Sequence, residues 1–162
     1  MLIKELAELV NGKLCGDENI EITRVAAIQN AANNEIAFIE KYKITPLYIN
    51  DKNYPQRLLN CYDSPVLLYY RGNADLNCSK IISIVGTRNN TDYGKMVCEK
   101  LIDNLSGENI LVISGLAFGI DTVAHKAALK NNLPTVGVLA HGLDRIYPTQ
   151  NKTLAKQMAE QG

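Results

Sequence analysis

Long apolar runs are missing from this 162-residue chain, and their absence sets the first limit on its class. No stretch reaches the ~18 residues that a membrane-spanning helix needs, so no membrane partner is predicted. The first residues, MLIKELAELVNGKLCG, carry Glu5 and Glu8 inside their apolar part, whereas a secretory signal has a basic start and an uninterrupted apolar region. We therefore expect a cytoplasmic protein.

Metal and nucleotide signatures are missing as well. The four cysteines form no CxxC pair, and nothing in the spacing of the two histidines indicates a metal site. The dinucleotide motif GxGxxG does not occur, and neither does GxxxxGK followed by Ser or Thr, so the usual NAD and ATP motifs are absent. We expect reduced cysteines, no metal and no cofactor.

Charge of one sign is not in excess, because the chain has 17 basic and 17 acidic side chains. Any contact with a nucleic acid must then come from a few well-placed groups rather than from bulk positive charge. The hydrophobic content of 46% is enough for a real core, so a folded domain is expected rather than a disordered chain.

Short apolar runs alternate with amphipathic stretches in the second half of the chain. Three runs have the β-branched content of buried strands: 80–86, 110–114 and 135–140. Helices are predicted after the Thr91 cap, over 120–131 and over 151–161. This β-α-β-α-β-α order predicts an α/β fold, in which a parallel sheet carries helices on both faces.

The first half is organised differently. Two short strands around a helix near 55–60 are predicted for residues 44–79, where they extend or flank the sheet. A small α+β appendage precedes them, with helices predicted over 3–10 and 31–42. The predicted domains are therefore 1–43 and 44–162.

Loops that follow parallel strands meet at one edge of a sheet, which is where open α/β folds bind ligands. The first such loop, GTRNNTDYG, leads into a helix start, whose exposed N–H groups favour an anion. Gly86 lets the backbone approach a ligand closely, and Arg88 adds a planar fork of donors that matches phosphate. The alternative is that this glycine serves packing alone.

The second loop, SGLAFGID, repeats the arrangement. Ser114 offers a hydroxyl, Gly115 and Gly119 open the backbone, and a second helix start follows. Phe118 lies between the glycines, where it either stacks on a base or plugs the core. Asp121 is interpreted as a helix cap rather than as a catalytic acid.

Four further polar residues lie in or near these loops. His125 falls on the apolar face of the second helix and is interpreted as a structural histidine. His141 follows the third strand, so it either contacts a phosphate or a base or has no role. Arg145 and Lys152 add charge near this edge or are simply solvated.

The motifs, in their order and spacing, resemble a known family. IVGTRNNTDYG, VISGLAFGIDTVAHKAAL and TVGVLAHGLDRIYPTQNKTLAKQMAEQG closely resemble successive motifs of the DNA-processing protein A (DprA/Smf) family, and the likeness runs from about residue 31 to 162. The resemblance implies a Rossmann-like domain that binds single-stranded DNA, forms dimers and helps to load the RecA recombinase during natural transformation, without an established catalytic activity. It implies a DNA-phosphate pocket made of Gly86, Thr87, Arg88, Ser114, Gly115, Phe118 and Gly119.

The sequence departs from the family's pattern at both ends. The family's domain continues past residue 162, so we expect a parallel sheet that is incomplete at its C-terminal end and lacks most of the dimer and RecA-contacting surface. Residues 1–26 weakly resemble instead the small N-terminal domain of LpxD acyltransferases and of Mur ligases.

The alternative function is that of a nucleotide-processing hydrolase with a related Rossmann-like fold, which would hold a nucleoside phosphate in the same strand-end pocket. Such enzymes normally carry a glutamate near a glycine-rich loop. No glutamate occurs in 110–122 or in 137–147, so the sequence favours binding over catalysis.

Overall fold

The computed structural model describes Lys4 and residues 43–161. The helices predicted over 3–10 and 31–42 and the resemblance of residues 1–26 lie outside these described residues. The chain divides into two compact units, Met1–Ile44 and Thr45–Gly162, and the following concerns the second unit. No helix in the described part is long and apolar enough to cross a membrane. The same residues contain no group of three or more His, Cys, Asp or Glu side chains placed to hold a metal ion.

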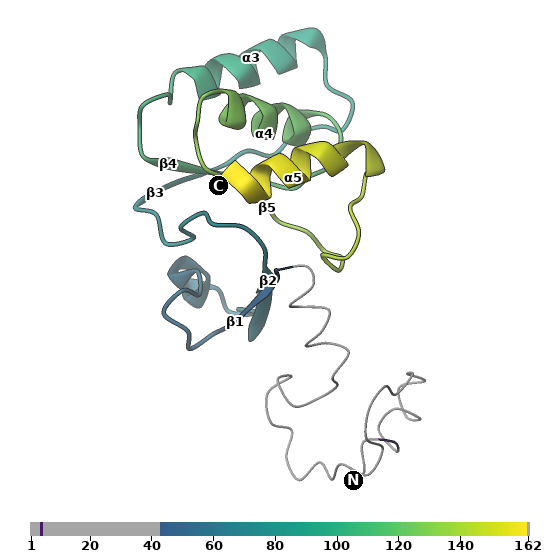
Figure 1. The fold of residues 1–162 in the computed structure, drawn as a ribbon. Helices are drawn as coiled ribbons and strands as arrows, with labels where there is room; N and C mark the ends of the chain where they lie inside the picture. Colours follow the sequence, from purple (N-terminus) through teal and green to yellow (C-terminus); the bar gives the residue numbers. More distant parts are fainter. Residues whose placement is uncertain (1–3, 5–42, 162) are drawn as a thin grey trace. The chain divides into compact units, whose positions relative to one another are not determined.

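A three-stranded parallel sheet forms the centre of the second unit (Figure 1). Its strands are β3 (Lys80–Ser83), β4 (Ile110–Ser114) and β5 (Thr135–Gly137), paired in the order β3-β4-β5. The parallel sheet and its three strands are confirmed. Strands β3 and β5 end earlier than the apolar runs that predicted them, because the chain turns into the loops that follow.

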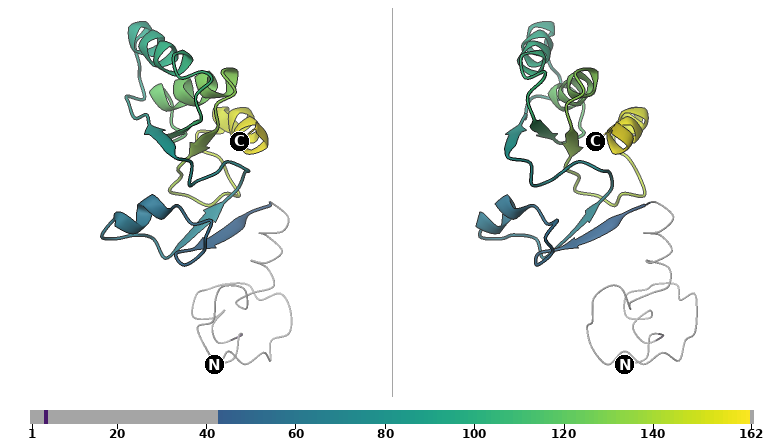
Figure 2. Two further views of the ribbon diagram at one scale, coloured as in Figure 1. Left: turned by 90° about the vertical axis from the view of Figure 1, so that its left-hand side faces the viewer. Right: turned by 60° about the vertical axis from the view of Figure 1, so that its left-hand side comes forward.

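Three helices accompany this sheet: α3 (Asp92–Asp103), α4 (Ile120–Lys130) and α5 (Lys152–Gln161). Figures 1 and 2 show α3 and α4 on the same side of the strands, and α5 beside the edge strand β5. The prediction of helices on both faces is therefore wrong for the described residues. The reason is the strand order: when right-handed crossovers lead from each strand to its immediate neighbour, the connecting helices fall on the same side.

The main core lies between the sheet and the first two helices. Val112 of β4 and Ile102 of α3 are completely buried there, and α4 contributes small side chains that let it approach both. The buried members of this cluster are Ile84, Cys98, Ile102, Val112, Ala124, Ala127, Ala128 and Leu133. A second cluster, in which Leu154 and Met158 of α5 pack with Leu116, attaches α5 to the edge where the strands end.

Thr91 caps the first helix as predicted. Its hydroxyl oxygen accepts a 3.1 Å hydrogen bond from the amide of Gly94, and its own backbone is extended. This satisfies one of the amides that a helix start leaves unpaired and ends the loop after β3 at a defined place.

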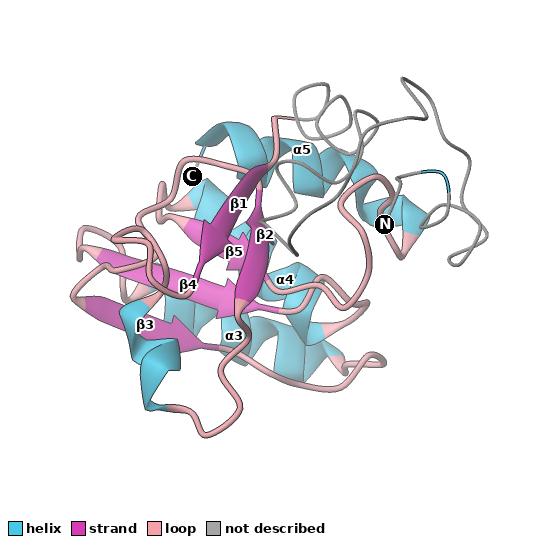
Figure 3. Ribbon diagram, turned by 90° about the horizontal axis from the view of Figure 1, so that it is seen from below, coloured by secondary structure: helices cyan, strands magenta, loops and turns pink. Residues whose placement is uncertain are grey.

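The lead-in segment forms its own antiparallel pair, β1 (Thr45–Tyr48) with β2 (Leu67–Tyr70), and does not extend the parallel sheet (Figure 3). A 3-10 helix, η2 (Gln56–Asn60), lies between the two strands, close to where a helix was predicted. Arg57 of η2 donates 2.8 Å hydrogen bonds to the carbonyls of Cys78 and Ser79. This guanidinium therefore ties the lead-in segment to the start of β3.

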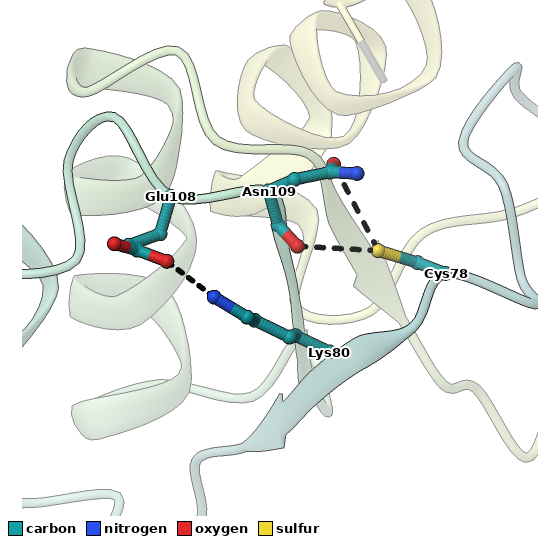
Figure 4. A network of polar contacts seen from close by, with 4 residues as sticks. All are labelled: Cys78, Lys80, Glu108 and Asn109. Atoms are coloured by element: carbon teal, nitrogen blue, oxygen red, sulfur yellow. Dashed lines mark hydrogen bonds and ion pairs between the residues drawn. The ribbon is translucent and has the colours of Figure 1, made fainter.

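The amino ends of β3 and β4 are joined by side chains (Figure 4). Lys80 hydrogen-bonds Glu108, and this bond holds the pKa of the Glu108 carboxyl below its ordinary value. Next to it, the thiol of Cys78 lies 3.5 Å from the carbonyl oxygen of Asn109. These contacts lie at the opposite edge of the sheet from the glycine loops.

Candidate functional site

The loops after β3 and β4 touch at the carboxyl edge of the sheet. The amide of Ile120 donates a 3.1 Å hydrogen bond to the carbonyl oxygen of Thr87. The backbones of Gly119 and Arg88 are so close that a Cβ at position 119 would lie 2.7 Å from the Cα of Arg88. We call residues 86–88 and 114–119 together the rim, since the structure brings them into one continuous edge.

Packing between the two loops accounts for two of the rim glycines. A Cβ on Gly86 would lie 2.7 Å from the Cβ of Ile120, and one on Gly119 would lie 2.1 Å from the carbonyl oxygen of Thr87. Gly119 also has φ +80°, a conformation that side chains disfavour. The packing role left open for Gly86 is thus real, and the same contact creates the shared edge.

Ser114 points into the protein rather than out of the rim. It is 4% exposed, and its hydroxyl donates a 2.7 Å hydrogen bond to the carbonyl oxygen of Ile84. Its one proton is therefore used to join the end of β4 to the segment that follows β3. In this position Ser114 shapes the rim and has no donor left for a bound anion.

Asp121 supports the loop that precedes its helix. Its carboxylate accepts a 3.3 Å hydrogen bond from the amide of Ala117, and a Cβ on Gly115 would lie 2.4 Å from the same oxygen. Gly115 thus makes room for a nearly buried carboxylate. Asp121 therefore supports the loop rather than capping α4, whose N-cap is Gly119 without a side-chain cap hydrogen bond.

His125 is a structural histidine, as predicted. It is completely buried, with Nδ1 2.7 Å from the Thr135 hydroxyl and Nε2 3.4 Å from the carbonyl oxygen of Gly115. Burial lowers the pKa of its imidazole, against smaller opposing effects of the Gly115 carbonyl and the Asp121 carboxylate. Burial therefore favours the neutral form of this ring, which lies beneath the rim.

Two further residues of the site were missed by sequence reasoning. Thr122 donates a 2.6 Å hydrogen bond to the carbonyl oxygen of Ala117. The buried Asn151 donates to the carbonyl oxygen of Leu116 at 2.8 Å and to the Thr122 hydroxyl at 2.9 Å. Asn151 lies far along the chain from its partners, and no local pattern could have paired them.

The exposed groups of the rim are those that could meet a ligand. Thr87 and Arg88 are exposed, and the amide of Asn89 donates a 3.2 Å hydrogen bond to the Thr87 hydroxyl. Phe118 is 44% exposed, so it does not plug the core. A guanidinium and an aromatic ring thus lie on loops that touch, which suits recognition of a phosphate beside a flat apolar group.

A family model described as DNA recombination-mediator protein A matches residues 45–162, which include the whole rim. The chain belongs to this DprA family. DNA processing protein DprA of Streptococcus pneumoniae is 38% identical over 151 residues, and the match covers 85% of this chain and 53% of that protein. DprA of Bacillus subtilis is 39% identical over 126 residues, 77% of this chain and 42% of that protein. The chain thus spans about half the length of these curated relatives.

Solved DprA structures share the fold. The X-ray structure of DprA from Streptococcus pneumoniae matches with a TM-score of 0.66 and 34% identity, covering 98% of this chain and 58% of that one. DprA from Helicobacter pylori, whose structure is described for its single-stranded DNA binding mode, matches with a TM-score of 0.63 and 29% identity, covering 75% of this chain and 54% of that one. The predicted α/β, Rossmann-like fold and the DprA/Smf resemblance are confirmed.

The third strand-end loop of this DprA-family chain is less closely tied to the rim. His141 has Nδ1 3.2 Å from the carbonyl oxygen of Gly142, and the exposed Arg145 pairs with Asp144 at 3.5 Å. Lys152 is exposed at the start of α5. Among the described residues, none of these three cationic or ring side chains hydrogen-bonds the rim, so their role in binding stays a prediction.

Proposed function

We propose that the chain binds single-stranded DNA through the rim, as part of DNA uptake and natural transformation. The observation that carries the proposal is the contact of the two glycine loops through the Ile120 amide and the Thr87 carbonyl, which places Arg88 and Phe118 on one exposed edge. The family match and the DNA-binding DprA of Helicobacter pylori give it independent support.

A phosphate would lie against Arg88 and the backbone of the loops. Gly86 and Gly119 let the two loops touch, and Gly115 makes room for the Asp121 carboxylate. The exposed Thr87 offers its hydroxyl beside Arg88, Ser114 holds the strand ends together, and a base stacks on Phe118. His141, Arg145 and Lys152 would make weaker contacts farther along the DNA strand. With a net charge of zero, affinity depends on this small set of groups rather than on the whole surface.

The role is binding and not catalysis. Each titratable side chain beneath the rim has a structural partner: the carboxylate of Asp121 accepts from a loop amide, and the imidazole of His125 lies buried against Thr135. A hydrolase would need an acid or a base in contact with its substrate. Incubation with nucleoside monophosphates should therefore release no free base, and release would favour the hydrolase alternative.

We propose that the chain acts in the cytoplasm and has two protein partners there, RecA and a second copy of the chain. Support comes from the family description as a recombination mediator. Residues 44–162 would carry DNA binding, with 1–43 as a separate appendage. Light scattering tests the dimer, and co-precipitation with RecA in the presence and absence of oligo-dT tests the complex.

The decisive experiment is a salt titration of oligo-dT binding for wild-type protein and two charge-matched variants. Arg88→Ala should weaken binding and reduce the slope of log K against log salt by about 0.7, the value for one single-strand phosphate contact. Lys130→Ala removes the same charge from the other end of α4 and should change neither quantity appreciably. Equal behaviour of the two variants, or no binding by the wild type, would refute the proposal.

A further inference from the structure

Two side chains outside the rim hold carbonyl groups of its second loop. The Thr122 hydroxyl donates to the carbonyl oxygen of Ala117 at 2.6 Å, and the Asn151 amide donates to that of Leu116 at 2.8 Å. Asn151 also donates to the Thr122 hydroxyl at 2.9 Å. The three bonds form a continuous chain from the entry of α5 through α4 to the loop.

Holding a carbonyl also orients the next amide. In a trans peptide the C=O of one residue and the N–H of the next point in opposite directions, and the described residues contain a single cis bond, Tyr147–Pro148. Because the Ala117 carbonyl points to Thr122, the Phe118 amide points away from it. That amide donates to no acceptor among residues 43–161.

The Phe118 amide stands beside the groups proposed above to bind DNA. It belongs to Phe118, whose ring is exposed, and precedes Gly119, whose backbone lies against Arg88. Peptide N–H groups presented in this way suit an anion. Asn151 is 5% exposed, and the hydroxyl proton of Thr122 is used on the Ala117 carbonyl, so neither side chain has a donor placed for the DNA strand itself.

We infer that Thr122 and Asn151 are positioning residues for DNA binding, which act by turning the Phe118 amide toward a phosphate. The inference rests on the proposed function of the rim. The segment before α5 thereby gains a role in the rim. It reaches the rim through the buried side-chain amide of Asn151 rather than through its charged side chains.

The test compares Thr122→Val, which removes the hydroxyl at nearly constant shape, with Thr122→Ser, which keeps it. Loss of one such hydrogen bond corresponds to about a three- to tenfold weaker affinity for oligo-dT. We expect that loss for Thr122→Val, less than about a twofold change for Thr122→Ser, and an unchanged salt slope for both, since no cation is removed. Asn151→Ala should resemble Thr122→Val and serves as the second variant if the first is unstable.

The amide resonance of Phe118, followed by NMR in the free protein and during titration with inorganic phosphate, provides a readout that stability alone would not move. We expect a phosphate-dependent shift in wild type and Thr122→Ser that is reduced in Thr122→Val. If the wild type binds oligo-dT while Thr122→Val and Asn151→Ala bind it equally well, the positioning role is overturned and the proposed function stands. If the wild type does not bind, the proposed function fails and this role fails with it.

Discussion

The backbones of Gly119 and Arg88 are in direct contact, although the two residues follow different strands. A Cβ at position 119 would lie 2.7 Å from the Cα of Arg88 and 2.1 Å from the carbonyl oxygen of Thr87. Contacts this short leave no room for a methyl group. The two loops of the rim therefore behave as one unit, and under the proposed function DNA that meets Arg88 would also meet the start of α4.

Replacing Gly119 by alanine should separate the loops. Gly119 and Gly107 have similar positive φ values, +80° and +85°, but a Cβ at Gly107 meets nothing within 4 Å. Backbone strain of about 1–3 kcal/mol is expected for either substitution. Gly119→Ala should cost clearly more in the free energy of unfolding, measured with urea, and should also weaken oligo-dT binding. Equal costs for the two variants would show that the loop contact is unimportant.

Phe118 should contribute affinity without contributing stability. Its ring is 44% exposed, so Phe118→Ala removes little from the core. If a base stacks on it, the loss is about 1–3 kcal/mol of binding free energy. Phe118→Tyr keeps an aromatic face and should retain most of the affinity. Binding that survives Phe118→Ala unchanged, measured by fluorescence anisotropy at fixed salt, would exclude the stacking role.

Ser114 should show the opposite behaviour. Ser114→Ala leaves the carbonyl oxygen of Ile84 without its 2.7 Å partner in the interior, which typically costs about 1–3 kcal/mol of folding stability. Ser83→Ala, at an exposed position at the end of β3, is the control and should change stability little. Chemical denaturation measures both. A stable Ser114→Ala protein with greatly weakened DNA binding would mean that the hydroxyl contacts the ligand directly.

His125 should make stability depend on pH. Burial lowers the pKa of its imidazole below the ordinary value of about 6.5, so between the two values the unfolded chain binds more protons than the folded one. The contribution of His125 to the free energy of unfolding should therefore be complete above pH ~6.5. It should fall as the pH is lowered from that value through the pKa of the folded state.

The two histidines of the chain permit a matched control for this prediction. His141→Gln should keep the fall in melting temperature between pH 7 and 5, whereas His125→Gln should lose most of it. An NMR titration of the His125 ring in the wild type gives the same information if the second variant is unstable. An unshifted His125 titration would contradict the burial argument.

The sequence by itself determined the alternation of strands and helices, the cap at Thr91 and the gathering of glycine loops at one edge. Each follows from local periodicity, from residue type at a helix start, or from the strand-helix-strand order that makes neighbouring strands parallel. The first two depend on neighbours within a few residues, and the third on the order of elements along the chain. They suffice to predict the fold class and the edge on which the rim lies.

Tertiary structure alone decided the side on which the helices lie, the inward direction of the Ser114 hydroxyl and the link from Asn151 to Leu116. Strand order chose a single face, because each strand pairs with its successor in the chain. The other two features join residues that lie at least thirty positions apart. Such pairs leave no periodic trace, since a hydrogen bond formed by folding depends on where the sheet and helices place its two ends.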